Sequence, residues 1–160
     1  MASPTKQQLK QELVLALTEE LETVERAHKA TQAAATHEEA KPENDKDTRA
    51  LEQSYLARGQ ALRATELRAA VADVTAMPLR AFGEDAPAAL GALVEASEDD
   101  ERRLFFIAPH GGGTRLAGGT VQVVTPEAPL GRALLGKRAG DECEVKLAGK
   151  TRALTIERVE

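Results

Sequence analysis

The feature that most constrains the fold is a heptad pattern of apolar and small side chains near the start of the chain. The side chains recur at alternating intervals of four and three residues, and they shrink from leucine to alanine and threonine. This pattern forms one stripe along an α-helix and is typical of a coiled coil. With Ser3 as N-cap and Pro4 at the first helical position, we predict a helix over residues 4–39, about 54 Å long. Its stripe comprises Leu13, Leu17, Leu21, Val24, His28, Thr31 and Ala35.

A second helical pattern follows a short polar turn over residues 40–47. Asn44 or Asp47 can cap the helix, which is predicted to run to about Ala76. Two long helices joined by so short a turn must lie antiparallel, because each has only one apolar stripe to cover. We interpret Gly59 as a site of close packing between them. The predicted stripe comprises Leu51, Tyr55, Arg58 or Gly59, Leu62, Thr65 and Ala69.

The distribution of glycine divides the chain into two domains. Residues 3–77 contain a single glycine, Gly59, and Met77-Pro78 marks the boundary, because a residue before proline disfavours helix. We therefore predict a coiled-coil hairpin over residues 1–78 and a second domain over residues 79–160. Five strands are predicted over residues 92–96, 104–108, 120–124, 143–148 and 152–159, with a short helix over 129–135. This combination indicates an α+β fold with a small antiparallel sheet.

Charge and cysteine content exclude several classes of protein. The net charge is -5, from 21 basic and 26 acidic side chains, which argues against direct binding to nucleic acid. Cys143 is the only cysteine, so no intramolecular disulfide is possible, and its position in an alternating segment predicts an inward-facing strand residue. No segment is apolar enough to span a membrane. We expect a cytoplasmic monomer without membrane contact.

Acidic side chains concentrate in the predicted turn between the helices. Glu43, Asp45 and Asp47 lie in the turn, and Glu39 immediately precedes it. One interpretation is a solvated turn whose acids favour the helix dipole. The other is a metal-directed tip, because hard cations such as Mg²⁺ bind carboxylate oxygens.

A histidine-glycine segment, residues 110–113, is similar to the oxyanion loop of some hydrolases. The G-x-S-x-G motif which that class requires does not occur in the sequence, so we interpret the segment as a mobile loop between strands.

Two segments resemble one known family. Residues 124–137, with the sequence VTPEAPLGRALLGK, are followed by Gly140-Asp141. This stretch resembles the C-terminal signature of the GreA/GreB family of transcription factors, with Thr125 and Ala128 in place of serines. Upstream, Pro42-Glu43-Asn44, Glu52 and Gly59 resemble the family's coiled-coil tip and returning helix.

The resemblance implies an antiparallel coiled coil joined to a domain like that of FKBP prolyl isomerases. It also implies that the second domain docks on RNA polymerase and that the hairpin enters the secondary channel. Tip carboxylates, above all Glu43, would then help to hold an Mg²⁺ ion of the polymerase, whose own active site cleaves backtracked RNA. The chain would be an accessory factor with no cofactor of its own, and RNA and DNA would be partners only through the elongation complex. The expected docking residues are Pro129, Leu130, Arg132, Leu134 and Lys137, with Leu130 and Leu134 as an apolar contact or, alternatively, as core.

One departure from the family leaves alternatives open. The family tip reads roughly G-D-L-x-E-N, and Ala40 stands where the aspartate is expected if Glu43-Asn44 matches the Glu-Asn pair. Glu39, Asp45 or Asp47 could replace that carboxylate. The alternatives are a factor that enters the channel and only modulates or inhibits transcription, a coiled-coil adaptor, and an FKBP-type prolyl isomerase. The last requires an aromatic-lined site, for which Phe82, Phe105 and Phe106 are the phenylalanines available.

Overall fold

The computed structural model describes residues 3–39 and 43–160, and it describes side chains outside residues 38–47. The element order is α1 (Lys6–Glu39), α2 (Glu43–Ala76), β1 (Leu93–Glu98), β2 (Glu101–Ile107), β3 (Arg115–Leu116), β4 (Val121–Val124), α3 (Pro129–Leu134), β5 (Glu142–Leu147) and β6 (Lys150–Val159). This architecture confirms the predicted fold class of two long helices followed by a sheet domain. The chain divides into two compact units, one of Ala16–Val71 and one that joins Met1–Leu15 to Ala72–Glu160. The sequence-based boundary between residues 78 and 79 stays a prediction.

Helix α1 begins with a capping box at Thr5, two residues later than the N-cap predicted from the sequence. The backbone N–H of Gln8 donates to Thr5 Oγ1 at 3.1 Å, and the backbone N–H of Thr5 donates to Gln8 Oε1 at 2.9 Å. These reciprocal bonds satisfy two backbone donors that the first turn leaves unpaired. The N-cap is therefore Thr5 and not Ser3, and the T-x-x-Q spacing that specifies it is visible in the sequence.

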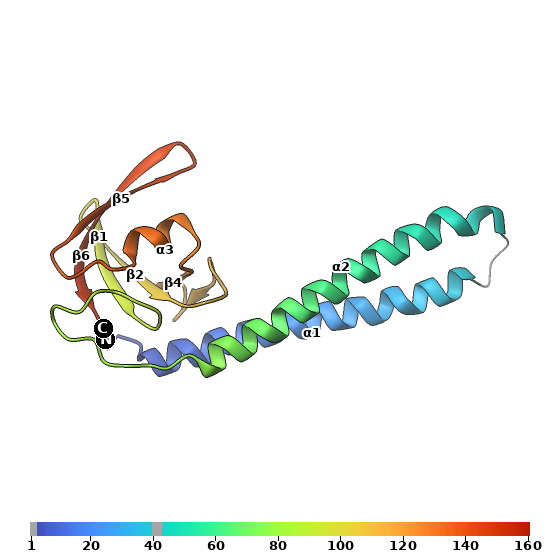
Figure 1. The fold of residues 1–160 in the computed structure, drawn as a ribbon, viewed down its shortest axis with the longest axis horizontal. Helices are drawn as coiled ribbons and strands as arrows, with labels where there is room; N and C mark the ends of the chain where they lie inside the picture. The colour runs from blue at the N-terminus through green and yellow to red at the C-terminus, as the bar shows by residue number, and fades with distance from the viewer. Residues whose placement is uncertain (1–2, 40–42) are drawn as a thin grey trace. The chain divides into compact units, whose positions relative to one another are not determined.

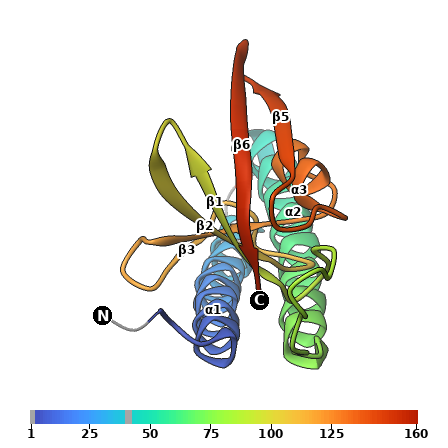
Figure 2. The ribbon, with the colours of Figure 1, turned by 90° about the vertical axis from the view of Figure 1, so that its left-hand side faces the viewer.

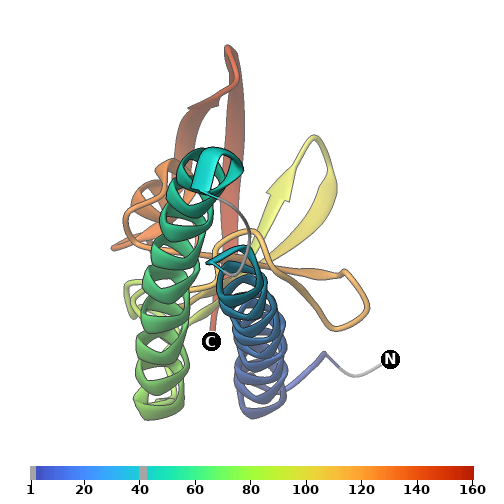
Figure 3. The same ribbon diagram turned by 90° about the vertical axis from the view of Figure 1, so that its right-hand side faces the viewer.

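In the unit of residues 16–71, α1 and α2 run antiparallel and side by side (Figures 1 and 3). The predicted stripe of α1 is confirmed: Leu17 and Thr31 are buried, and Leu21, Val24, His28 and Ala35 are partly buried. Salt bridges connect the two helices at Arg63–Glu20 (2.5 Å) and Arg68–Glu25 (3.1 Å). Because these side chains are about half exposed, the pairs contribute little to stability, and the stripe holds the helices together.

The predicted stripe of α2 is wrong. Leu51, Tyr55 and Leu62 are 54%, 60% and 62% exposed, and a Cβ at Gly59 would meet nothing within 4 Å. Gly59 is thus not needed for close packing. The helix instead faces α1 with a second heptad set, which is buried or partly buried and comprises Ala50, Gln53, Ala57, Gln60, Ala64, Leu67, Val71 and Val74.

Polar groups interrupt this seam between the helices. Among the described residues, the buried side-chain atoms that lack a hydrogen-bond partner are His28 Nδ1, Gln53 Oε1 and Gln60 Oε1. Each such group costs about 1–3 kcal/mol relative to a paired one. The large buried side chains Leu67 and Val74 lie nearer the end of α2, so the hairpin is held more firmly there than near its turn.

The second unit contains a six-stranded sheet with the order β3-β4-β2-β1-β6-β5. Its strands are drawn in Figures 1 and 2. Four of its neighbouring pairs are antiparallel, whereas β2 and β4 are parallel. The prediction of a wholly antiparallel, five-stranded sheet is corrected in these two respects. Parallel neighbours need a long connection, and residues 108–120 supply it and contain the short strand β3 that sequence analysis missed.

Helix α3 packs beside β5 and closes a core on one face of the sheet (Figure 2). This core includes Phe105, Ile107 and Leu154, and Cys143 is buried among them as predicted. Burial raises the pKa of the Cys143 thiol, so it stays neutral. Where β1 pairs with β6, the register shifts between Glu95 and Ala96.

The loop at residues 110–113 ties the sheet to the first turns of α1 and the end of α2, which belong to the same compact unit. His110 Nε2 lies 2.7 Å from Asp73 Oδ2, and a Cβ at Gly111, whose φ is +87°, would come within 2.6 Å of a Leu13 methyl carbon. The backbone N–H of Ala117 donates to Glu12 Oε2 at 2.9 Å. The loop therefore connects strands, as expected, and also packs against a helix. No helix in the described part of the chain is long and apolar enough to cross a membrane.

The corrected seam predicts different costs for two leucines of α2. Leu67→Ala removes a side chain that is 1% exposed and should destabilise the protein by about 2–4 kcal/mol. Leu62→Ala, its matched control, removes one that is 62% exposed and should change the free energy of unfolding by less than about 0.5 kcal/mol. Urea unfolding followed by far-UV circular dichroism measures both. Equal losses would contradict the assigned seam.

Candidate functional site

The predicted tip carboxylates lie outside the described side chains. Glu39 is the last residue of α1 and Glu43 is the first residue of α2, with Asp45 in the first turn of that helix. Because α2 starts at Glu43, Asn44 and Asp47 belong to the helix and do not cap it. Ala40 lies outside the described residues. In the part of the chain whose side chains are described, no three His, Cys, Asp or Glu residues are grouped so that they could hold a metal ion.

The predicted docking segment is built around a close backbone contact. A Cβ at Gly131, in the middle of α3, would lie 1.8 Å from the carbonyl oxygen of Thr125. Only glycine allows this approach. Two further bonds hold the turn: the N–H of Ala128 donates to Thr125 O at 3.2 Å, and the N–H of Arg132 donates to Ala128 O at 2.9 Å. The short helix is therefore pressed against the turn that precedes it.

The end of the same segment is also fixed by the backbone. The N–H of Gly136 donates to Ala88 O at 2.8 Å, and the N–H of Ala88 donates to Lys137 O at 2.8 Å. Further on, the N–H of Gly140 donates to Ile156 O at 2.7 Å, while Asp141 Oδ2 accepts the N–H of Arg138 at 2.9 Å. The glycines and the aspartate of this motif thus have structural roles: they attach the α3 segment to β6 and to the strand-free segment before β1.

The structure separates the predicted docking residues into two groups. Leu130 and Leu134 are 5% and 0% exposed and belong to the core, so the interpretation of these leucines as a surface contact is corrected. Pro129 and Arg132 are exposed, and Lys137 is partly exposed. Any docking by this segment must therefore use Pro129, Arg132 and Lys137, and that role stays a prediction.

The same stretch of chain decides the family. Residues 89–160 match the family model described as "Transcription elongation factor, GreA/GreB, C-term". The C-terminal domain belongs to the GreA/GreB family. The resemblance inferred from residues 124–141 is thereby confirmed for this domain. No curated protein matches the chain in sequence.

Solved structures similar to this chain include several named after the same family. GreA factor homolog 1 (Gfh1) of Thermus thermophilus is 14% identical, with 92% of this chain and 94% of that chain covered and a TM-score of 0.41. Gfh1 of Thermus aquaticus is 16% identical, with 91% and 92% covered and a TM-score of 0.42. A GreA/GreB elongation factor from Nitrosomonas europaea is 17% identical, with 68% and 90% covered and a TM-score of 0.38.

The GreA/GreB domain also carries a cavity that sequence analysis did not identify. It lies on the sheet and is lined by arginines from separate strands, among them Arg103, Arg115 and Arg152. These residues are far apart in the sequence and belong to no motif. Only the pairing order of the strands brings them together, so no local signal could have revealed them.

The close contact at Gly131 predicts a large loss of stability on substitution. Gly131→Ala forces a methyl group onto a backbone oxygen and should cost about 3 kcal/mol in the free energy of unfolding. Gly83→Ala is the matched control, because a Cβ there would meet nothing within 4 Å and the residue has no positive φ. Thermal unfolding of both variants checks the prediction, and a Gly131→Ala protein as stable as the control would refute it.

Proposed function

We propose that this chain is an accessory factor of RNA polymerase that stimulates cleavage of backtracked RNA. The observation that carries the proposal is the match of residues 89–160 to the GreA/GreB C-terminal model, in a chain whose preceding residues form a helical hairpin. In this proposal the GreA/GreB domain docks on the polymerase. The hairpin enters the secondary channel, and its turn reaches the active site.

The outer face of α2 supports a hairpin that works inside a partner. Leu51, Tyr55, Leu56 and Leu62 are each more than half exposed. Large apolar side chains grouped on an exposed face commonly mark a contact surface. A channel that surrounds the hairpin would cover this face, whereas in a hairpin surrounded by solvent these apolar side chains would stay exposed to water.

The proposed chemistry belongs to the polymerase, and the tip assists it. A water oxygen bonds to phosphorus of the RNA backbone while the P–O3′ bond breaks, and the departing 3′ oxygen takes up a proton. An Mg²⁺ ion in such a site stabilises the developing charge and activates the water. Glu43 is the residue we propose to direct the ion, with Glu39, Asp45 or Asp47 as the second carboxylate, because hard cations bind carboxylate oxygens.

The second candidate function is modulation or inhibition without cleavage. The observation that favours it is Ala40, which stands where the family tip is expected to have an aspartate. A factor with one tip carboxylate fewer would still occupy the channel. It would then compete with substrate entry and would not promote hydrolysis.

Replacement of Glu43 separates the two candidates. In stalled, backtracked elongation complexes, wild-type protein should accelerate transcript cleavage, and Glu43→Gln should lower this stimulation by about tenfold to a thousandfold, as expected for one lost electrostatic contact in the transition state. Glu22→Gln, an exposed glutamate of α1, is the control and should behave like wild type. Equal stimulation by Glu43→Gln would exclude the assigned role of Glu43.

A gain-of-function variant tests the inhibitor alternative directly. If wild-type protein binds polymerase without stimulating cleavage, Ala40→Asp should introduce cleavage in the same assay. That outcome assigns the wild type to the second candidate. Cleavage by neither protein, with binding intact, would reject tip-directed hydrolysis altogether.

Docking is predicted to depend on the exposed side chains of the α3 segment. Arg132→Glu combined with Pro129→Ala should weaken polymerase binding about tenfold or more, because one charge is reversed and one exposed contact is removed. The melting temperature should change little, since both side chains are exposed. Lys150→Glu, at the exposed first residue of β6, is the charge-matched control in a fluorescence-anisotropy binding assay. Normal binding by the folded double variant would refute the docking role.

A further inference from the structure

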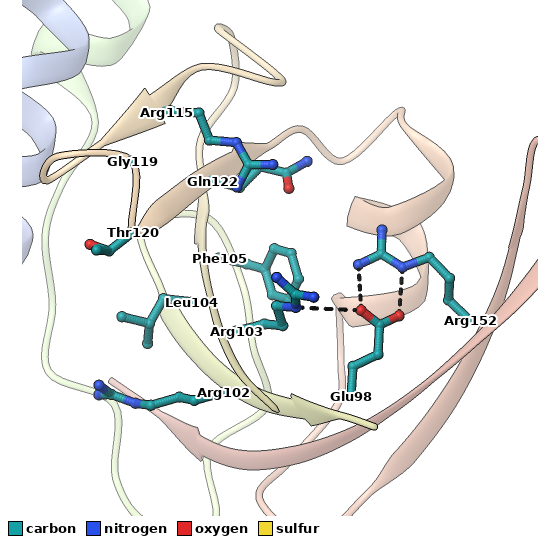
Figure 4. A pocket seen from close by; sticks show the side chains of 10 residues that line it. All are labelled: Glu98, Arg102, Arg103, Leu104, Phe105, Arg115, Gly119, Thr120, Gln122 and Arg152. Atoms are coloured by element: carbon teal, nitrogen blue, oxygen red, sulfur yellow. Dashed lines mark hydrogen bonds and ion pairs between the residues drawn. The ribbon is translucent and has the colours of Figure 1, made fainter. Parts of the chain in front are cut away.

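A cavity of about 630 Å³ lies on the face of the sheet that also carries α3 (Figure 4). Its walls come from strands that are neighbours in the sheet. The register places Arg103 opposite Ala96, and Gln122 opposite both Phe105 and Arg115. Phe105 and Ala96 belong to the core under α3. The arginine side chains therefore continue the same face beyond the part that α3 covers.

Glu98 holds two of these arginines in place. Arg152 Nε and Nη2 donate to its two carboxylate oxygens at 2.6 and 2.9 Å, and Arg103 Nε lies 3.5 Å from Oε1 (Figure 4). The side chain of Glu98 is only 12% exposed. The hydrogen bonds from Arg152 lower the pKa of Glu98, so the carboxylate stays ionised. One anchored carboxylate thus fixes two guanidinium groups that would otherwise be mobile.

The anchoring leaves positive charge and hydrogen-bond donors unused. A guanidinium has five N–H donors, and Arg152 uses its Nε and Nη2 groups to donate to Glu98. Arg103 gives a second bond to Glu101 Oε2 at 2.8 Å, which still leaves donors free. Within the described part of the chain, the side chain of Arg115 makes no hydrogen bond or ion pair, although its backbone pairs with β4. The cavity therefore combines preorganised donors with one unpaired cation, in a chain whose net charge is -5.

The chemistry of the lining indicates the class of ligand. Planar guanidinium groups bind phosphate oxygens in pairs, and donors from three separate strands suit an anion with oxygens in several directions. The volume falls in the range of small-molecule sites, about 300–1,000 Å³. Phe105, the aromatic residue at the cavity, is 1% exposed and offers no ring face to a base. A single-stranded nucleic acid needs such stacking surfaces and a long basic groove, so a small anion fits better.

We propose that this cavity binds a di- or triphosphate anion, either free or as the phosphate chain of a nucleotide, through Arg103, Arg115 and Arg152. The ligand is recognised by its phosphates and not by a base. The cavity shares no lining residue with the tip or with the exposed residues of α3, so the proposal does not depend on the cleavage function proposed above.

Isothermal titration calorimetry of the full chain, at constant ionic strength and without divalent cations, tests the ligand class. Pyrophosphate and tripolyphosphate should each bind with one site per chain, and orthophosphate should bind at least about tenfold more weakly because it reaches fewer arginines. ATP and GTP should agree with tripolyphosphate within about threefold if the base is not read. Absence of binding by every phosphate, or binding of only one nucleotide, would overturn the proposal. Binding of an oligo-glutamate peptide without any phosphate would overturn it in favour of an acidic protein segment.

A pair of variants tests the location. Arg115→Gln removes the unpaired cation and should weaken tripolyphosphate binding about tenfold or more without loss of thermal stability. Lys146→Gln removes one exposed positive charge from the opposite face of β5, which does not line the cavity, and should leave the affinity unchanged within about twofold because solvent and salt screen that charge. Equal weakening by both variants would indicate a general charge effect and would overturn the assigned site.

Discussion

The approach of Gly131 to the carbonyl oxygen of Thr125 is the contact on which the GreA/GreB domain depends. It lets α3 lie flat against the turn after β4, and this position buries Leu130 and Leu134 in the core. Most of the signature motif is therefore explained by backbone geometry. Since α3 has only six residues, it covers part of one sheet face and leaves the remainder to the arginine cavity. One face of the sheet is thus apolar where α3 covers it and charged where the arginines line the cavity.

In the hairpin, large buried side chains at one end fix which face of α2 packs against α1 along its length. Large side chains of both helices are buried where Leu17 and Leu67 lie. A straight helix carries that register onward in steps of seven residues, from Leu67 to Gln60 and Gln53. The seam nearer the turn consequently contains amides and alanines, and the leucines of α2 face outward. A hairpin built in this way keeps a weak distal seam and an apolar outer face.

Much of the fold could be predicted because its signals are local. The heptad stripe of α1 and the alternation in β5 depend on residues close together in the chain, and the structure confirms them. The errors have non-local causes. The leucines of α2 by themselves predict the wrong stripe, because the partner helix decides which face of α2 is buried. The parallel pairing of β2 with β4 depends on the path of the connection between them, and no local sequence pattern predicts that path.

The sequence by itself determined the two long helices, the short helix, five of the six strands and the family of the C-terminal domain. These properties follow from periodicity, backbone conformation and a contiguous motif. The tertiary structure decided which face of α2 is covered, that Leu130 and Leu134 are core, and that Arg103, Arg115 and Arg152 share one cavity. The physical reason is that burial and charge clustering depend on which segments pack together, and residues distant in the chain acquire a common environment only when the strands pair.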